Sequence, residues 1–363
     1  MDIEERMQLI LRPPTEEVVT VEELRRLLET KTTPVAYNGF EPSGLAHLGT
    51  GLICAYKMRD LIEAGVKVKV LLATHHAWIN NKLGGDLEKI KLAAKHFIHA
   101  WTACGVPRDK VEYIMADELY DDVEYWNKVL KVARELTIAR AKRTLEIAGR
   151  QSVEAKKVAD LIYTPMQVAD IFHLGVDICQ LGMDQRKANM VARELGPSLG
   201  FWKPVSVHHH LLLGLDAPPT WPLTEEKAKE VMSSIKMSKS KPTTSIFIYD
   251  PPEEIRKKVL RAFCPEKEVK FNPILEIAKY IVFRERDELV IEKPAKFGGE
   301  KLEYHSYGEL EKDYAAGKIH PLDLKNAVAE ALIEILKPVR DYFASNKEAY
   351  ETLAVVKQFE ITR

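Results

Sequence analysis

The stretch that decides the fold is VAYNGFEPSGLAHLGT, residues 35–50. It begins with a run typical of a β-strand, and Gly39 breaks this run. A Pro-Ser-Gly turn follows, and the stretch ends on a lone histidine, His47, beside Gly49. A tight turn that happens to carry a histidine would explain the fragment by itself. Because an amphipathic segment comes directly after it, the fragment also fits a strand that passes through a ligand-binding turn into a helix.

Strand and helix patterns alternate on both sides of this stretch. Upstream, Thr20 and Glu23 have the spacing of a capping box that starts a helix. The other expected elements are the strands 35–40, 66–74, 110–116, 176–182 and 204–215 and the helices 49–65 and 86–105. This alternation predicts an α/β fold, a Rossmann-like doubly wound parallel sheet with helices on both of its faces.

The pattern changes twice along the chain. From about residue 117 to residue 160 the strand signals stop and helical signals continue, which predicts a helical insertion. After the basic loop KMSKS, residues 236–240, the signal is almost wholly helical to the end. We therefore expect a Rossmann-type domain over residues 1–245 and an all-α domain over residues 246–363.

Composition limits the class of protein. The chain has 363 residues and a net charge of −1, so any nucleic-acid contact must come from local basic patches. No apolar run approaches the roughly 20 residues of a membrane span, and the N-terminus is acidic before it is apolar, which is the wrong order for a signal peptide. The four cysteines lie far apart, which argues against a zinc or disulfide framework and suits a reducing cytoplasm.

Two segments are suited to phosphate binding. The turn after the strand 35–40 should lie at the carboxyl end of the sheet, where free N–H groups of the next helix favour anions. There Gly49 would let a phosphate approach the backbone, and His47 could donate a hydrogen bond to it. Lys236 and Lys239 lie three residues apart on a serine-rich loop, as a mobile clamp on a polyphosphate would need. The alternative for this loop is a solvated linker.

Together, these segments resemble a known family. Pro42-Ser43-Gly44 with His47-Leu48-Gly49, and Lys236 to Ser240, are similar to the two ATP signatures of class I aminoacyl-tRNA synthetases. From about Thr20 to its end the chain resembles the tyrosyl-tRNA synthetases of the archaeal and eukaryotic-cytosolic type. The segments that carry this narrower resemblance are YNGFEPSG (37–44), YTPMQVADIFHLGVDICQLGMDQRK (163–187), KFGG (296–299) and HPLDLKNAVAEAL (320–332).

The chain departs from the family pattern at two places. Thr50 stands where the first signature usually closes on a second histidine. A hydroxyl can still hydrogen-bond a phosphate, so we expect activity to be retained. Residues 217–235, before the lysine loop, are also longer than the usual connection in the family.

A further polar set lies in YTPMQVAD. Thr164 can act as a helix N-cap and Pro165 as the first helical residue. Gln167 and Asp170 then share one helix face within a largely apolar segment. Because a buried polar group without a partner is costly, this face should border either an internal polar network or a polar ligand.

The resemblance assigns roles to these residues. Tyr37 and Asp170 would hydrogen-bond the phenolic hydroxyl of L-tyrosine, and Tyr163, Gln167 and Gln185 would hold its ammonium group. The implied ATP contacts are Gly39, His47, Gly49, Thr50, Asp184, Lys236 and Lys239, with Asp184 on the ribose hydroxyls. His47, Lys236 and Lys239 would be the catalytic groups, acting by stabilising charge on the transferring phosphates. ATP is then a substrate and Mg²⁺ accompanies its phosphates, with no protein-bound metal expected.

The resemblance also implies tRNA(Tyr) as a partner, a homodimer and a cytoplasmic location. The insertion carries the cations Arg140, Lys142, Arg143, Arg150, Lys156 and Lys157. A solvated helix face would explain them, whereas the resemblance places the acceptor stem there and has Arg143 read its end pair. In the C-terminal domain Phe297 can stack on a base, and His320 and Asp323 are expected near the first anticodon base. The simpler explanation for His320-Pro321 is a helix start with Asp323 in its first turn.

Other assignments explain less of the sequence. A tryptophanyl-tRNA synthetase shares both ATP signatures, but an indole has no hydroxyl for Tyr37 and Asp170. A catalytically silent RNA-binding relative is favoured by Thr50 and opposed by the retained tyrosine and ATP residues. A different nucleotidyltransferase would not need the helical C-terminal domain. The histidine runs 75–76 and 208–210 do not predict a zinc site, because adjacent strand residues point to opposite faces.

Overall fold

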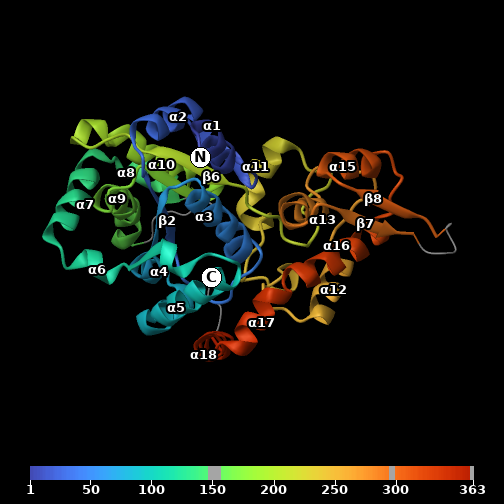
Figure 1. Ribbon diagram of the computed structural model, residues 1–363. Coiled ribbons are helices and arrows are strands. Elements are labelled where there is room, and N and C mark those ends of the chain that lie inside the picture. The colour runs from blue at the N-terminus through green and yellow to red at the C-terminus, as the bar shows by residue number, and fades with distance from the viewer. Residues whose placement is uncertain (146–156, 294–298, 360–363) are drawn as a thin grey trace. The chain divides into compact units, whose positions relative to one another are not determined.

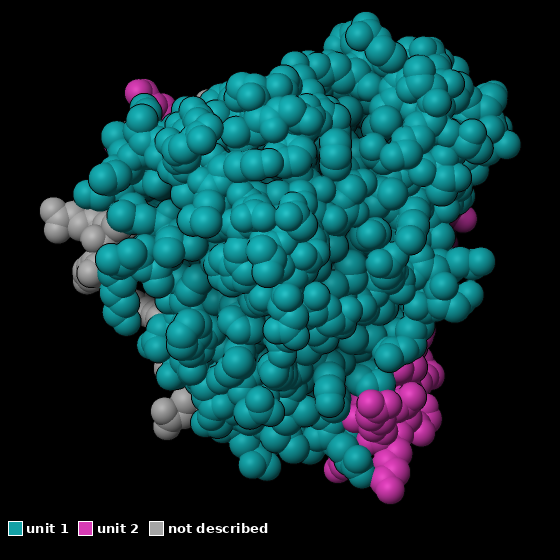
Figure 2. All heavy atoms as spheres, turned by 90° about the vertical axis from the view of Figure 1, so that its left-hand side faces the viewer, with its two compact units in different colours: residues 1–45, 54–211, 351–363 teal, residues 46–53, 212–350 magenta. Residues whose placement is uncertain are grey.

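The computed structural model describes residues 1–145, 157–293 and 299–359 (Figure 1). The chain divides into two compact units, drawn in teal and magenta in Figure 2. Unit 1 comprises residues 1–45, 54–211 and 351–363, and unit 2 comprises residues 46–53 and 212–350. These units differ from the two domains expected from the sequence, because the turn at residues 46–53 groups with the second half of the chain. The division at 245/246 stays a prediction.

Unit 1 is built on a six-stranded sheet. Its strands are β1 (Thr15–Val19), β2 (Val35–Phe40), β3 (Lys67–Leu72), β4 (Val111–Met115), β5 (Ile178–Gly182) and β6 (Val205–His209). The order is β1-β6-β5-β2-β3-β4, in which β2 to β6 pair in parallel and β1 pairs antiparallel with β6. The strand order reverses between β2 and β5, which makes this the switch point of a doubly wound sheet. The predicted fold class is confirmed.

Strand β1 was not predicted from the sequence. Its residues, TEEVV, include only two apolar side chains, and four of the five are half-buried rather than buried. As the antiparallel edge strand it is stabilised by pairing with β6 rather than by burial of its own side chains. An edge strand of this kind leaves no periodic apolar signal.

The helices of unit 1 follow the expected order with changes at their ends. They are α1 (Ile3–Leu11), α2 (Val21–Thr30), α3 (Cys54–Glu63), α4 (Thr74–Ile79), α5 (Leu87–Ala103), α6 (Asp117–Tyr120), α7 (Val123–Glu135), α8 (Ile138–Leu145), α9 (Val158–His173) and α10 (Arg186–Leu195). The capping box before α2 is present, with Glu23 N–H donating to Thr20 Oγ1 at 3.1 Å. Residues 49–53 form a π-helical turn, η1, ahead of α3. The predicted helical insertion is present over its described part as α6, α7 and α8.

The predicted start of α9 is wrong. The helix begins at Val158, capped by Lys157 and Asp160, so that Pro165 lies inside it. Thr164 is not a cap, because its hydroxyl hydrogen-bonds Thr144 Oγ1 at 2.5 Å instead. The residues before Pro165 already form a turn of helix that packs against α8, and this packing outweighs the lost backbone hydrogen bond.

The core of unit 1 lies where the sheet meets the insertion. Side chains of β5, α7, α9 and α10 form one buried cluster, which includes Cys179, Tyr125, Val168 and Val191. Tyr37 of β2 belongs to the same cluster. Polar groups that end in this cluster are therefore shielded from water.

Unit 2 is mostly helical, as predicted, with one addition. Its helices are α11 (Glu225–Ile235), α12 (Pro252–Arg261), α13 (Pro273–Ile277), α14 (Phe283–Glu285), α15 (Tyr307–Ala315), α16 (Pro321–Ile335) and α17 (Lys337–Ser345), and α18 (Lys347–Val356) follows. A short antiparallel pair, β7 (Leu289–Glu292) and β8 (Lys301–Tyr304), accompanies them. In the long segment before the lysine loop, residues 217–235, the last eleven residues form α11. None of the helices described has the length and hydropathy to cross a membrane.

A buried ion pair on α3 fixes the end of α1. Lys57 and Asp60 are both fully buried and lie 3.0 Å apart. Lys57 Nζ also donates to the carbonyl oxygens of Ile10 and Arg12, at 3.0 Å each. Because it joins three acceptors, this ammonium holds the C-terminal end of α1 against α3.

We predict that Lys57→Met lowers the stability of the protein strongly. The change removes the ammonium that lies 3.0 Å from the buried carboxyl of Asp60, and breaking a buried pair in this way costs about 3–5 kcal/mol. The urea midpoint of unfolding, followed by tryptophan fluorescence, should fall accordingly. Lys67→Met is the matched control, because Lys67 pairs with Glu112 at the surface, where such pairs contribute about 0–1 kcal/mol. Equal shifts for the two variants would contradict the prediction.

Candidate active site

One group of predicted site residues surrounds a buried carboxyl in unit 1. Asp170 of α9 is 2 % exposed, and its Oδ1 accepts a hydrogen bond from the hydroxyl of Tyr125 at 2.9 Å. Tyr37 of β2 lies close enough for the charge of Asp170 to raise its pKa further. The Tyr37 hydroxyl is buried without a hydrogen bond of normal geometry among the described residues, although Gln167 lies near it. The structure thus brings the predicted residues Tyr37, Gln167 and Asp170 together.

Burial sets the protonation of this half of the site. It raises the pKa of Asp170 to about 8, and the hydrogen bond from Tyr125 offsets part of this rise. Burial also raises the pKa of Tyr37 well above its usual value. Near neutral pH the ligand-free site therefore holds neutral phenols beside a carboxyl that is mostly protonated.

A second carboxylate lies at the other end of this set. Glu41, in the turn after β2, accepts hydrogen bonds from the hydroxyl of Tyr163 and from Asn80 Nδ2, the latter at 2.7 Å. Gln167 Nε2 donates to Gln185 Oε1 at 3.3 Å. This end offers carboxylate and amide oxygens, which are suited to an ammonium group.

Asp184 lies at the end of β5, in the short 3₁₀ turn η4 (Met183–Gln185). The preceding residue, Gly182, leaves it room. A Cβ built on Gly182 would lie 2.7 Å from Asp184 Oδ1 and 2.9 Å from Leu211 Cδ2. The glycine therefore lets the Asp184 carboxylate lie directly against the strand end.

A separate group of predicted site residues surrounds the turn at His47 in unit 2. The N–H of Gly49 donates to His47 Nδ1 at 3.1 Å, so the proton of the neutral ring is on Nε2. Burial, with the charges of Lys239 and Lys236, lowers the pKa of His47 to about 3. The ring is therefore a neutral hydrogen-bond donor at physiological pH. The His47 N–H in turn donates to Thr50 Oγ1 at 3.2 Å, which fixes the turn.

The lysine loop is anchored through the residues between its two lysines. Met237 is buried, and its N–H donates to the carbonyl oxygen of Leu212 at 2.7 Å. Ser238 exchanges two hydrogen bonds with Ser245, at 3.2 and 2.8 Å. Both lysines act on the pKa of His47, so the structure brings the three predicted catalytic residues of unit 2 into one electrostatic group.

The predicted RNA-binding residues lie on two helices. Arg143 is exposed on α8, where its carbonyl oxygen accepts from Lys187 Nζ at 3.2 Å. His320 is the N-cap of α16, and its Nδ1 accepts from the N–H of Leu322 at 3.2 Å. Asp323 lies in the first turn of the same helix, so the simpler explanation for this motif describes its local structure. Phe297, Arg150 and Lys156 lie outside the described residues.

Sequence reasoning missed His76 and Tyr125, and it did not assign a role to Glu41. Glu41 stands inside the quoted turn, so its type and position were visible from the start. Tyr125 comes from the helical insertion and His76 from α4. Neither belongs to a motif, and only tertiary packing brings them to Asp170.

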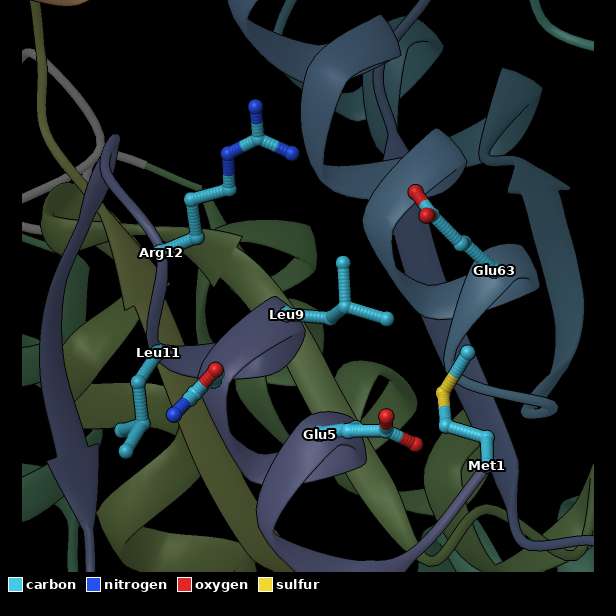
Figure 3. A pocket seen from close by; sticks show the side chains of 7 residues that line it. Met1, Glu5, Leu9, Leu11, Arg12 and Glu63 are labelled. Atoms are coloured by element: carbon cyan, nitrogen blue, oxygen red, sulfur yellow. The ribbon is translucent and has the colours of Figure 1, made fainter.

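Two other features do not belong to this site. His208 hydrogen-bonds Asn189 and Glu17, whereas His209 hydrogen-bonds Gln180, so the two adjacent rings lie on opposite faces of β6 as expected. Among the residues that the structure describes, no group of three or more His, Cys, Asp or Glu side chains is arranged to hold a metal ion. A surface hollow at α1 and α3 contains none of the predicted site residues (Figure 3). Its lining residues are Met1, Glu5, Gln8, Leu9, Leu11, Arg12 and Glu63.

We predict that Lys239→Met raises the pKa of His47. A cation that disfavours the imidazolium is removed, so the ring should begin to protonate at a higher pH than in the wild type. Histidine-selective ¹⁵N NMR, with the His47 signals assigned through His47→Gln, measures this. Lys241→Met is the control, because Lys241 donates to the carbonyl oxygen of Ser234 and does not perturb His47. A wild-type His47 that titrates near 6.5 would contradict the assignment.

The chain is similar to known proteins over nearly its whole length. The family described as tRNA synthetases class I (W and Y) matches residues 29–337. The tyrosine--tRNA ligase of Thermococcus kodakarensis is 50% identical over 379 residues and is covered completely, as is this chain. The crystal structure of a tyrosyl-tRNA synthetase from Pyrococcus horikoshii, complexed with L-tyrosine, has a TM-score of 0.91 and 48% identity, with 98% of this chain and 100% of that chain covered.

A tryptophanyl-tRNA synthetase from Giardia lamblia is a more distant structural neighbour. It has a TM-score of 0.70 at 17% identity, with 98% of this chain and 93% of that chain covered, and this likeness shows the fold alone. The full-length similarity to tyrosine--tRNA ligases is much higher. The chain belongs to the class I tRNA synthetases, in the tyrosine--tRNA ligase family.

Proposed function

We propose that the chain activates L-tyrosine with ATP to tyrosyl-adenylate and transfers the tyrosyl group to the 3′ end of tRNA(Tyr). The observation that carries this proposal is the buried pair of Asp170 and Tyr37, whose polar groups lie close together within a largely apolar core. Full-length relatives named tyrosine--tRNA ligase support the same reaction. The activity is that of a ligase which forms an aminoacyl-tRNA ester.

The phenolic end of tyrosine is recognised by Tyr37 and Asp170. The carboxylate accepts from the substrate hydroxyl. The Tyr37 hydroxyl, which has no hydrogen bond of normal geometry among the described residues, completes the set. Phenylalanine would leave both groups unpaired, at about 1–3 kcal/mol for each buried polar group and more for the charge. At the other end, Tyr163, Gln167 and Gln185 hold the substrate ammonium, and Glu41 supplies a negative charge there.

The first step joins tyrosine to ATP. The tyrosine carboxylate attacks the α-phosphorus, a carboxyl–phosphate bond forms, and pyrophosphate leaves. The neutral His47 donates from Nε2 to a phosphate oxygen, and Lys236 and Lys239 balance the charge that develops on the leaving group. No protein nucleophile or general base is required. Asp184 binds the ribose hydroxyls.

The remaining ATP contacts belong to the backbone turns. Gly39 leaves room for the Tyr37 ring and Gly49 for the His47 ring, and Thr50 braces the turn that holds His47. We expect Mg²⁺ to arrive with the phosphates of ATP, which divalent cations bridge. The tyrosyl group then passes from the adenylate to the terminal adenosine of the tRNA.

The RNA is held by two parts of the chain. Arg143 on α8 contacts the acceptor end, which assigns the helical insertion to the acceptor stem. Asp323 and His320 at the start of α16 contact the anticodon, and Phe297 stacks on a base. On this proposal residues 1–245 form the catalytic domain and residues 246–363 the anticodon-binding domain.

A homodimer is supported by the surface of α7. Val123, Trp126 and Leu130 follow one another at helical spacing and are 72%, 39% and 66% exposed. Such an apolar stripe on a helix is suited to burial against a second copy. The four free cysteines, three of them buried, fit a reducing cytoplasm, where we place the reaction.

We predict that the chain catalyses exchange of pyrophosphate into ATP with tyrosine alone, in the absence of tRNA. Tryptophan and phenylalanine should give only background rates, because neither places a hydroxyl between Tyr37 and Asp170. Exchange with tryptophan would overturn the roles of these two residues. No exchange with any of the three would favour the catalytically silent RNA-binding protein instead.

We predict that Asp323→Asn weakens use of tRNA without affecting tyrosine activation. Loss of a charged hydrogen bond of about 1.5–3 kcal/mol should lower kcat/KM for tRNA(Tyr) in aminoacylation by about 10- to 100-fold, while pyrophosphate exchange stays unchanged. Asp313→Asn is the control, since Asp313 lies on the unrelated helix α15 and pairs with Lys318. Equal aminoacylation by the two variants would remove Asp323 from the anticodon site.

A further inference from the structure

A buried histidine, His76, lies beside Asp170 and Tyr163. It lies on α4 with 2 % of its surface exposed. Neither ring nitrogen has a hydrogen-bond partner of normal geometry within the described part of the chain. The ring packs edge-on against Tyr163, with 4.6 Å between the ring centroids. Because buried polar groups are paired in the great majority of cases, two unpaired nitrogens on one ring need an explanation.

Two groups that could accept from His76 lie beside it: the backbone of Tyr163, which is near enough to raise the pKa of the ring, and the carboxyl of Asp170. His76 Nε2 lies 3.8 Å from Asp170 Oδ2, which is just beyond hydrogen-bond reach. The other oxygen of Asp170, Oδ1, already accepts from Tyr125. Each oxygen of this buried carboxyl therefore lies near a different side chain. Tyr125 of α7 hydrogen-bonds Oδ1, and His76 of α4 lies near Oδ2.

Few titratable groups face this pair, and most of them are neutral. Those that face Asp170, His76 or the adjoining Tyr37 are Tyr37 and Cys179 of the sheet, Tyr120 and Tyr125 of the insertion, Tyr163 of α9, Glu41 of the turn and His75 of α4. Burial lowers the pKa of His76 to about 4, against a smaller opposing effect of Glu41. The ring is thus neutral at physiological pH and carries a single N–H.

We propose that His76 is a positioning residue for tyrosine, donating from Nε2 to Asp170 Oδ2 so that the ionised carboxylate accepts the substrate's phenolic proton. This inference rests on the proposed function, because it concerns the same phenol-binding carboxyl. A carboxylate has about four lone-pair positions, so donors from His76, Tyr125 and the substrate can bind it together. The contact needs the two atoms to approach from 3.8 Å to about 2.9 Å.

The proposal gives the Asp170 carboxyl a defined proton balance. In the ligand-free site the carboxyl is mostly protonated near neutral pH, since its pKa is about 8. The phenol of tyrosine donates a hydrogen bond to the carboxylate and remains protonated. The carboxyl must therefore release its own proton to solvent when tyrosine binds. Binding should therefore strengthen as the pH rises through about 8. Any change that removes a donor from the carboxylate disfavours ionisation and moves this transition to higher pH.

The test compares His76→Phe with His76→Gln in tyrosine-dependent pyrophosphate exchange. Phe keeps the ring and removes the N–H, so we expect KM for tyrosine to rise by about 10- to 100-fold, as for one hydrogen bond to a charged group, with kcat and KM for ATP unchanged. The acid limb of the kcat/KM profile for tyrosine should move to higher pH by about one unit for each tenfold. Gln places an amide N–H near the position of Nε2 and should restore most of both effects.

Two further variants sharpen the result. Tyr125→Phe removes the other donor to Asp170 and should move the acid limb in the same direction. His75→Phe is the matched control on the same helix, because His75 faces Asp117 at 3.7 Å rather than Asp170. It should leave KM for tyrosine and the pH profile as in the wild type.

Each outcome decides the question. A wild-type KM for tyrosine and an unmoved acid limb in His76→Phe would overturn the inference. It would also be overturned if His76→Phe impaired kcat, KM for tyrosine, KM for ATP and the melting temperature alike and His76→Gln failed to restore them, because that pattern describes a structural role. Calorimetric binding of tyrosine separates this inference from the proposed function. A wild-type chain that neither binds nor activates tyrosine would overturn the proposed function first, whereas a wild-type chain that does both, with an unaffected His76→Phe, would overturn only the role of His76.

Discussion

The burial of the Asp170 carboxyl is the constraint on which the polar group in the core of unit 1 depends. The side chain enters the core on α9, a helix that packs against α7 and α10 around the switch point of the sheet. A carboxyl at this depth is costly unless hydrogen-bond donors surround it. The fold supplies Tyr125 as one donor and places the hydroxyl of Tyr37 nearby, with no hydrogen bond of normal geometry in the described part of the chain. On the proposed function, the phenolic hydroxyl of tyrosine completes this set.

The group around His47 combines a neutral ring with two charged side chains. Gly49 fixes the tautomer of His47 through Nδ1, and the two lysines help to keep its ring uncharged. On the proposed function, the histidine contributes a directed hydrogen bond to the phosphates, while Lys236 and Lys239 contribute charge. A protonated histidine in the same place would repel the lysines. Burial and the lysine charges act in the same direction, so this arrangement holds over the whole physiological pH range.

Much of this could be predicted from residue patterns, and the remainder depends on packing. The strands β2 to β6 are signalled by apolar runs, and the turn around His47 by its glycines. The edge strand β1 has no apolar pattern that predicts it, because polar side chains make up most of its residues. The predicted start of α9 is too late because a proline is typical of the first turn of a helix, whereas Pro165 lies inside this one. Tyr125 and His76 could not be found at all, because no local pattern shows that α7 and α4 meet at Asp170. The spacing in YTPMQVAD, by contrast, was enough to bring Gln167 and Asp170 onto one buried face.

Thr50 illustrates how a departure from a motif can leave the chemistry in place. Its hydroxyl accepts from the backbone N–H of His47, three residues before it, as the N3 side chain of a capping box does. The same turn aims the ring of His47 through the hydrogen bond from Gly49, a contact that does not involve the side chain at position 50. The His47 ring is thus held by backbone geometry and a small hydroxyl together. Threonine at this position therefore keeps a hydrogen bond that fixes the turn, and on the proposed function the His47 donor stays available to the phosphates.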